Sequence, residues 1–287
     1  MCKYVLPGYY LYISRLKAPW AIVSWFVMYP FAASLGVFYF AEENIFSRAI
    51  VYIFAFMACL SVYEIGYIWN DRLTMRVESE YVTQRLDPSD ASVLKRYYRK
   101  IVISKGLVSL LLCLLISLIA MLLRLEISIS KFVAALMLMN MTFFVHNHVR
   151  SKWSIATFMM LCCLKYIVFV FLFPVISTGG MINLIITEII LIPLLRTIEY
   201  STKRRYRLGF FRTLVGDLDW FRIKYYIIVA GICVVLYSVH QRYVILLLMS
   251  SIFMVIFRIA TLILSIKLKL RNKDMLGVSI ADQQGRP

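Results

Sequence analysis

Long apolar runs are the feature that most constrains the fold of this 287-residue chain. They cover about residues 20–41, 48–69, 101–123, 131–147, 154–176, 181–197, 223–240 and 243–266. Each has roughly the length of about 20 residues that a helix needs to cross a bilayer. Hydrocarbon offers no water to satisfy backbone groups, so each run must be helical. The pattern predicts an all-α, polytopic membrane helical bundle with about eight transmembrane helices. We expect one transmembrane domain over residues 1–270 and a short polar cytoplasmic tail over 271–287.

The composition excludes an ordinary soluble domain of this size. Hydrophobic residues make up 62% of the chain and charged residues only 16%, a balance that soluble domains rarely show. The six cysteines mostly lie inside apolar runs without metal-binding spacing, which favours small buried side chains over disulfides or metal ligands. The N-terminus lacks the pattern of a signal peptide, so we expect the first span to be retained.

The net charge of +17 is distributed unevenly. Threading eight spans places the N-terminus, the loops near 70–100, 147–153 and 197–222, and the C-terminus on one face, which holds most of the Lys and Arg residues. Cytoplasmic loops are enriched in Lys and Arg. We therefore expect both termini and both long polar loops to be cytoplasmic, as in a multi-pass protein of a bacterial inner membrane. Topology and contact with anionic headgroups account for much of this charge.

A polar cluster follows the second run, where an apolar helix leads into Asn70, Asp71 and then Glu78. Uncompensated polar groups near hydrocarbon are costly, so these residues are candidates for function. Oxygen ligands suit Mg²⁺, which usually keeps waters and substrate phosphates in its shell. We predict that Asn70, Asp71 and Glu78 form the catalytic and metal site. The alternative is a solvated helix end with ordinary caps.

Ionisable residues inside the apolar runs are further candidates, because membrane charges usually face a cavity and pair with each other or with a ligand. They are Glu64, Lys105, Lys165, Glu188, Arg196, Glu199 and Arg258. Tyr63 and Tyr67 lie near the polar cluster. Lys165 is in the middle of its span, and Glu188 is a possible partner for it.

Basic and polar residues at the cytoplasmic loops are candidates for binding phosphate. They are Arg72, Arg85, Asn147, Arg150, Lys203, Arg204 and Arg205. Arg offers paired donors to a phosphate, although the same residues also serve topology. A role in nucleic-acid binding is disfavoured, because the basic residues border spans and no nucleic-acid module is recognisable. His146 and His148 point apart on a helix and lack further zinc ligands.

This arrangement resembles the UbiA-type intramembrane prenyltransferase superfamily, whose polar motifs follow the second and sixth spans. The family's first motif, Asn-Asp-x-x-Asp-x-x-x-Asp, aligns with Asn70, Asp71, Thr74 and Glu78. Residues 83–85, Thr-Gln-Arg, resemble the Thr-x-Arg segment that often follows, and residues 14–20 resemble the start of the first helix. The second motif departs from the family, because Ser, Thr, Lys and Arg stand where acids are usual, with Glu199 nearby.

The resemblance implies a Mg²⁺-dependent transferase that acts on a polyprenyl phosphate or diphosphate together with a phosphorylated co-substrate at the cytoplasmic face. One branch of the superfamily transfers phosphoribose to a polyprenyl phosphate, and basic residues at the second motif are compatible with that reaction. The missing acids leave open a catalytically degenerate protein that binds or transports a lipid phosphate. Lys165 and Glu188 leave open an ion-coupled transporter, although no inverted repeat is evident.

Overall fold

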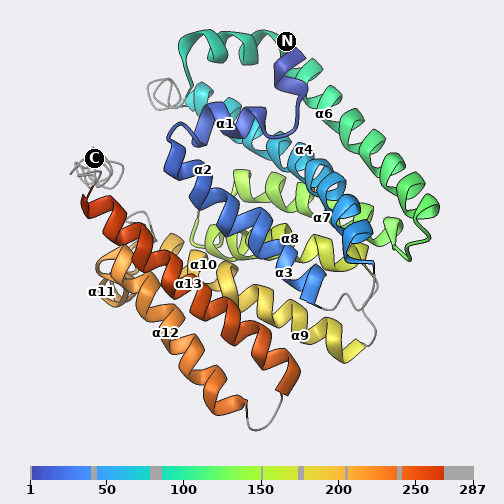
Figure 1. Ribbon diagram of the computed structural model, residues 1–287. Helices are drawn as coiled ribbons and strands as arrows, with labels where there is room; N and C mark the ends of the chain where they lie inside the picture. Colours follow the sequence, from blue (N-terminus) through green and yellow to red (C-terminus); the bar gives the residue numbers. More distant parts are fainter. Residues whose placement is uncertain are drawn as a thin grey trace. The chain divides into compact units, whose positions relative to one another are not determined.

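The computed structural model describes residues 2–39, 44–77, 86–149, 151–173, 178–203, 206–237 and 241–267. These residues are helical or lie in short connections, and none of them forms a strand. The elements are η1 (Cys2–Val5), α1 (Tyr9–Arg15), α2 (Pro19–Phe26), η2 (Val27–Phe31), α3 (Ala32–Tyr39), α4 (Ile45–Val77), α6 (Pro88–Leu122), α7 (Ile129–His148), α8 (Ser154–Leu172), α9 (Thr178–Ile189), η3 (Ile190–Leu194), α10 (Leu195–Ser201), α11 (Gly209–Val215), α12 (Leu218–Leu236) and α13 (Gln241–Lys267) (Figure 1). The all-α prediction is confirmed for this part of the chain.

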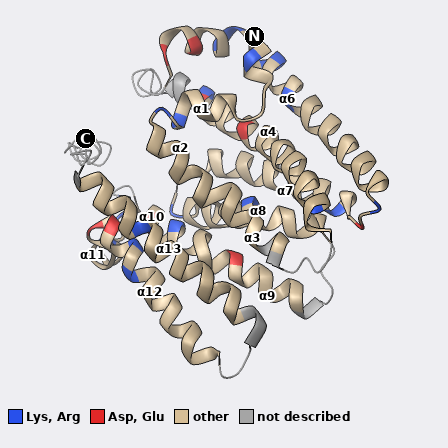
Figure 2. Cartoon of the chain, in the orientation of Figure 1, with Lys and Arg blue, Asp and Glu red and all other residues tan. Residues whose placement is uncertain are grey.

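Six of the described helices are long and apolar enough to cross a membrane. They span Ile45–Leu73, Pro88–Leu122, Ile129–His148, Ser154–Leu172, Gly180–Ser201 and Val244–Ile266. Helices also occupy the other two predicted runs, as the shorter apolar stretch Pro19–Leu35 and as α12. The described charged residues of α12 gather at its start, and the rest of the helix carries none (Figure 2). The count of eight spans stays a prediction.

Two prolines inside apolar helices are accommodated by π-helical turns. Pro30 lies in η2 and Pro193 lies in η3. Proline has no N–H to donate and its ring crowds the preceding turn, so the helix must widen or bend there. Tyrosine hydroxyls donate to carbonyls of the first of these turns, Tyr166 to Met28 and Tyr52 to Pro30, both at 2.6 Å. The turn is thus supported from α8 and α4.

The chain divides into two units, which we describe separately, Met1–Glu188 and Ile189–Pro287. In the first unit, α4 packs along α6 and also against α7, while α7 packs against α8. A short connection joins α6 to α7, but α6 packs mainly on α4. The single domain predicted over 1–270 stays a prediction, and the predicted tail lies outside the described residues.

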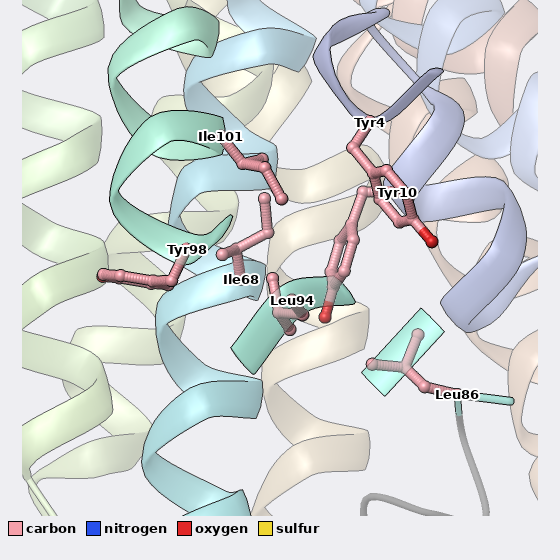
Figure 3. Packing of buried hydrophobic residues seen from close by; sticks show 7 residues of the cluster. All are labelled: Tyr4, Tyr10, Ile68, Leu86, Leu94, Tyr98 and Ile101. Carbon is pink, nitrogen blue, oxygen red and sulfur yellow. The ribbon is translucent and has the colours of Figure 1, made fainter. Parts of the chain in front are cut away.

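The N-terminal segment closes one end of the α4–α6 pair. A buried cluster joins residues of η1 and α1 to residues of α4 and α6 (Figure 3). Its members are Tyr4, Tyr10, Ile68, Leu86, Leu94, Tyr98 and Ile101. Because Tyr4 and Tyr10 are almost completely buried here, their hydroxyls need partners in this unit. The hydroxyl of Tyr10 finds its partner in Asp71, so the start of the chain lies next to the predicted polar cluster.

In the second unit, α12 and α13 form the main helical pair, and α10 and η3 pack against them. Asp217 caps α12 by accepting hydrogen bonds from the backbone N–H groups of Asp219 and Trp220. A carboxylate at this position also interacts favourably with the helix dipole. The cap fixes the beginning of α12, from which charged side chains reach α10.

Candidate functional site

Asp71 is the centre of the described polar site in the first unit. Its side chain is 1% exposed and lies near the end of α4. Arg15 donates from Nη2 to Oδ1 at 2.9 Å and from Nη1 to Oδ2 at 3.0 Å, and the Tyr10 hydroxyl donates to Oδ2 at 2.6 Å. The carboxylate is therefore held by a two-pronged, charge-assisted contact, which is among the stronger hydrogen-bond arrangements in proteins.

The protonation states of the two α1 partners follow from this environment. Burial, together with the negative charge of Asp71, raises the pKa of Tyr10 well above its usual value. Burial opposes the charge of Arg15, but the carboxylate of Asp71 outweighs it and raises the pKa of the guanidinium. Tyr10 therefore remains a neutral donor and Arg15 remains a cation, so both can donate to the Asp71 side chain.

Other predicted residues join this site. The guanidinium of Arg15 lies 4.0 Å from the ring centroid of Tyr67, a distance at which a cation is attracted to an aromatic face. Tyr67 packs edge-on against Tyr63. Asn70 Nδ2 is 3.4 Å from Asp71 Oδ1. The structure thus gathers Asn70, Asp71, Tyr67 and Tyr63 around an α1 residue that the sequence analysis did not select.

Glu64 and Lys105 form a second, fully buried set. Their side chains are 0% exposed, with Lys105 Nζ 2.5 Å from Glu64 Oε2. Glu64 also accepts from the backbone N–H groups of Gly8 at 3.0 Å and Leu11 at 2.7 Å, and Lys105 donates to the Leu6 carbonyl at 3.2 Å. These contacts tie the start of α1 to α4 and α6, so Glu64 and Lys105 hold the N-terminal segment in position.

Lys165 lies in a cage of tyrosine rings. Its Nζ is 3.6 Å from the ring centroid of Tyr29, 4.9 Å from that of Tyr63 and 5.9 Å from that of Tyr166. Aromatic faces attract an ammonium most strongly when water is excluded. The tyrosine rings therefore stabilise the ammonium group of Lys165, and its pairing with Glu188 stays a prediction.

Three of the remaining predicted residues make contacts in the described part of the chain. Arg72 lies 3.9 Å from the ring centroid of Tyr98, Asn147 Nδ2 donates to the Gly66 carbonyl at 3.1 Å, and Lys203 lies 4.2 Å from the ring centroid of Tyr200. The other predicted residues, Glu78, Arg85, Arg150, Arg204 and Arg205, lie outside the described residues.

Glu199 belongs to the second unit and is held by two arginines. Arg196 donates from Nη1 to Oε2 at 3.0 Å, while Arg222 donates from Nε to Oε1 at 2.5 Å and from Nη2 to Oε2 at 3.2 Å. Asp219 contacts Arg222 as well, at 3.3 Å. The sequence analysis named Arg196 and Glu199 but missed Arg222. The i,i+3 spacing of Asp219 and Arg222 was the available signal.

The surroundings of Asp71 bear on the predicted magnesium site. Within the described ranges, no group of three His, Cys, Asp or Glu residues could hold a metal ion. Both oxygens of Asp71 already accept hydrogen bonds from Arg15. The described donor set in this arrangement does not fit Mg²⁺, which binds through available carboxylate oxygens. Because Glu78 is outside the described residues, the magnesium site stays a prediction.

The helices and their composition define an integral multi-pass membrane protein. No protein-family model, curated protein or solved structure matches the chain.

Proposed function

We propose that this protein is a UbiA-like membrane protein of about eight spans that binds a polyprenyl phosphate or diphosphate at the cytoplasmic face of a bacterial inner membrane. The Arg15–Asp71 pair carries the proposal. A guanidinium offers the same paired donors to a phosphate as to a carboxylate. A lipid phosphate that reaches the end of α4 would compete with Asp71 for Arg15, while the neighbouring apolar helices accommodate the isoprenoid.

Asn70 and Asp71 resemble the first motif of the UbiA-type superfamily, and this resemblance supports a transferase activity. The transferred group would be a prenyl group, or phosphoribose donated to a polyprenyl phosphate, in a Mg²⁺-dependent reaction. Removing Arg15 from Asp71 leaves a buried charge without its partner, which typically costs about 3–5 kcal/mol. A substrate phosphate would offset part of the net cost of separating the pair, because it would accept the hydrogen bonds that Arg15 donates. We therefore expect release of the Asp71 carboxylate to depend on bound substrate.

A second candidate is a protein that binds or moves the lipid phosphate without consuming it. Two observations favour it. Arg15 donates to both oxygens of Asp71, and basic residues occupy the positions where the resembling family has its second acidic motif. In this version the Arg15–Asp71 pair is a permanent structural contact, and phosphate is held by cations alone.

A transfer assay on the full chain in nanodiscs tests both candidates. Radiolabelled prenyl diphosphates and phosphoribosyl diphosphate are offered separately with Mg²⁺ and a membrane-lipid extract, and label is counted in the lipid phase. Labelled lipid that disappears with chelator and in Asp71→Asn establishes a transferase and identifies its donor.

A binding assay with labelled farnesyl phosphate completes the experiment. Saturable binding without product selects the non-catalytic candidate. If the folded protein neither labels lipid nor binds farnesyl phosphate, the proposed function is wrong. Asn44→Gly serves as a control for purification and reconstitution, because this residue precedes α4 at the end opposite Asp71 and has a positive φ that glycine adopts without strain.

A further inference from the structure

A pocket of about 510 Å³ lies where α6 ends and α7 begins. The residues that line it are Ser117, Ala120 and Met121 of α6 and the following residues 125–129. Its volume is within the range of about 300–1,000 Å³ that small-molecule sites occupy. Because α6 is long and apolar enough to cross a membrane, the pocket is at the end of a membrane span, where lipid headgroups are available.

Backbone hydrogen bonds fix the shape of this connection. The N–H of Leu125 donates to the Ala120 carbonyl at 2.8 Å, a bond typical of the Schellman motif that ends many helices. Arg124 has a φ of 51°, the left-handed conformation that this motif requires. The N–H of Ser128 then donates to the Leu172 carbonyl of α8 at 2.8 Å. The pocket is therefore formed before a ligand arrives.

The polar groups of the lining favour a cation with hydrogen-bond donors. Among the described residues that line the pocket, Glu126 carries the only charge, and it is exposed. Ser117 and Ser128 add hydroxyl groups. The Ser117 hydroxyl donates to the Cys113 carbonyl, and the Ser128 side chain makes no capping hydrogen bond to α7. A carboxylate and hydroxyl oxygens match an ammonium group, which donates three hydrogen bonds and accepts none.

Basic residues stand on both sides of Glu126 in the sequence. Arg124 precedes it by two residues, Lys131 is in the first turn of α7, and both are exposed. The connection from α6 to α7 thus carries both signs of charge (Figure 2). The exposed apolar residues of the last α6 turns are Leu114, Leu118, Met121 and Leu122. A phospholipid with a zwitterionic headgroup matches this combination of an anion, two cations and an apolar helix surface.

We propose that this pocket binds the headgroup of phosphatidylethanolamine, with Glu126 accepting hydrogen bonds from the ammonium group. Arg124 and Lys131 supply positive charge for the phosphate, and the acyl chains lie along α6. Phosphatidylcholine fits less well because its quaternary ammonium has no N–H to donate, and phosphatidylglycerol has no cation for Glu126. The cluster beside Asp71 contains Leu94 and Tyr98 from the beginning of α6, whereas the pocket is at its end. The inference is therefore independent of the proposed function and goes beyond it.

Native mass spectrometry of the full-length protein tests the headgroup. The protein is reconstituted in nanodiscs of equal parts phosphatidylethanolamine, phosphatidylcholine and phosphatidylglycerol, and the lipids that stay bound after release are identified. Glu126→Gln removes the charge and Glu126→Lys reverses it. Asp87→Asn is the matched control, because Asp87 is an exposed acid at the other end of α6 and its side chain makes no capping hydrogen bond. The thermal unfolding midpoint in pure phosphatidylcholine nanodiscs reports folding.

We expect wild type and Asp87→Asn to retain phosphatidylethanolamine in preference to phosphatidylcholine. Glu126→Gln should reduce this preference about two- to fivefold, as expected for an ion pair at an exposed carboxylate, with an unchanged midpoint. Glu126→Lys should shift the preference to phosphatidylglycerol. Ser117→Leu fills the pocket without changing its charge and should lower the retention of phosphatidylethanolamine. If the Glu126 variants do not fold, the Ser117→Leu result decides.

Two results with these lipids would overturn the site. One is wild-type protein that retains phosphatidylcholine equally well or prefers phosphatidylglycerol. The other is a preference for phosphatidylethanolamine that persists in both Glu126→Gln and Ser117→Leu, because the lipid would then bind elsewhere.

A soluble amine shares the ammonium chemistry, so ethanolamine is titrated separately into protein in pure phosphatidylcholine nanodiscs. The proposal expects no change in the unfolding midpoint, because the acyl chains contribute to binding. A rise of the wild-type midpoint that is lost in Glu126→Gln, without a lipid preference, would identify a soluble amine as the ligand and contradict the proposal.

Discussion

Glu64 and Lys105 form an ion pair that is completely buried between α4 and α6. Breaking a buried pair from one side leaves an uncompensated charge, which typically costs about 3–5 kcal/mol. We expect Glu64→Gln and Lys105→Met each to lower the free energy of unfolding by roughly this amount. The double variant should be less destabilised than the sum of the two. A double-mutant cycle from denaturant unfolding measures the coupling, and additive losses would contradict it.

The Tyr10 hydroxyl contributes to stability through Asp71. Tyr10→Phe removes a donor to a buried carboxylate, and we expect a loss of about 1.5–3 kcal/mol. Tyr12→Phe is the matched control on the same short helix, because Tyr12 is 54% exposed. Thermal unfolding of both variants in the same detergent measures the difference. Equal midpoints for the two variants would show that the contact with Asp71 adds nothing.

Stability should also depend on pH through Tyr10. Its pKa in the folded protein lies well above the ordinary value of 10.0, so the folded state keeps a proton that the unfolded chain loses. This contribution is fully present below pH 10 and is lost as the pH rises above that value. Unfolding midpoints between pH 8 and pH 11 should fall less steeply in Tyr10→Phe than in wild type. Parallel curves would count against the raised pKa.

Gly66 sets the close approach of α4 to α7. A Cβ atom at this position would lie 2.3 Å from ring atoms of Phe143. We expect Gly66→Ala to cost about 1–3 kcal/mol, the usual range for overpacking a core. Gly106→Ala is the control, because a Cβ there meets nothing within 4 Å and alanine favours a helix. Denaturant unfolding of both variants measures this cost. A free energy of unfolding for Gly66→Ala equal to that of wild type would contradict the close contact between Gly66 and Phe143.

Hydrophobic run length was sufficient to predict the helices, because a chain in lipid has few other ways to satisfy its backbone. The same signal located the polar cluster at the end of α4. It did not identify Arg15 or Tyr10, which are 56 and 61 residues from Asp71 in sequence. Residues 14–20 resembled the start of a family helix, but no local pattern indicates which distant carboxylate such a basic residue will meet.

Lys105 illustrates the other limit of the sequence. A lysine near the end of an apolar run can extend to the interface or bind a phosphate, and its position in the sequence is compatible with either role. The structure instead buries it against Glu64, 41 residues earlier, and the Leu6 carbonyl. Its environment depends on three segments meeting, which a single-helix pattern does not encode. The contact of Arg222 with Glu199 also joins two helices, although the i,i+3 spacing to Asp219 offered a local signal for this arginine.

The contacts of Glu64 also have a consequence for biogenesis. Glu64 accepts from the backbone of Gly8 and Leu11, yet its charge is balanced by Lys105. Because Lys105 follows Glu64 by 41 residues, the carboxylate is synthesised before the cation that neutralises it. The first turn of α1 obtains its complete set of partners only after α6 has followed α4. The start of this chain thus completes its contacts only after Lys105, 99 residues beyond Leu6, has been synthesised.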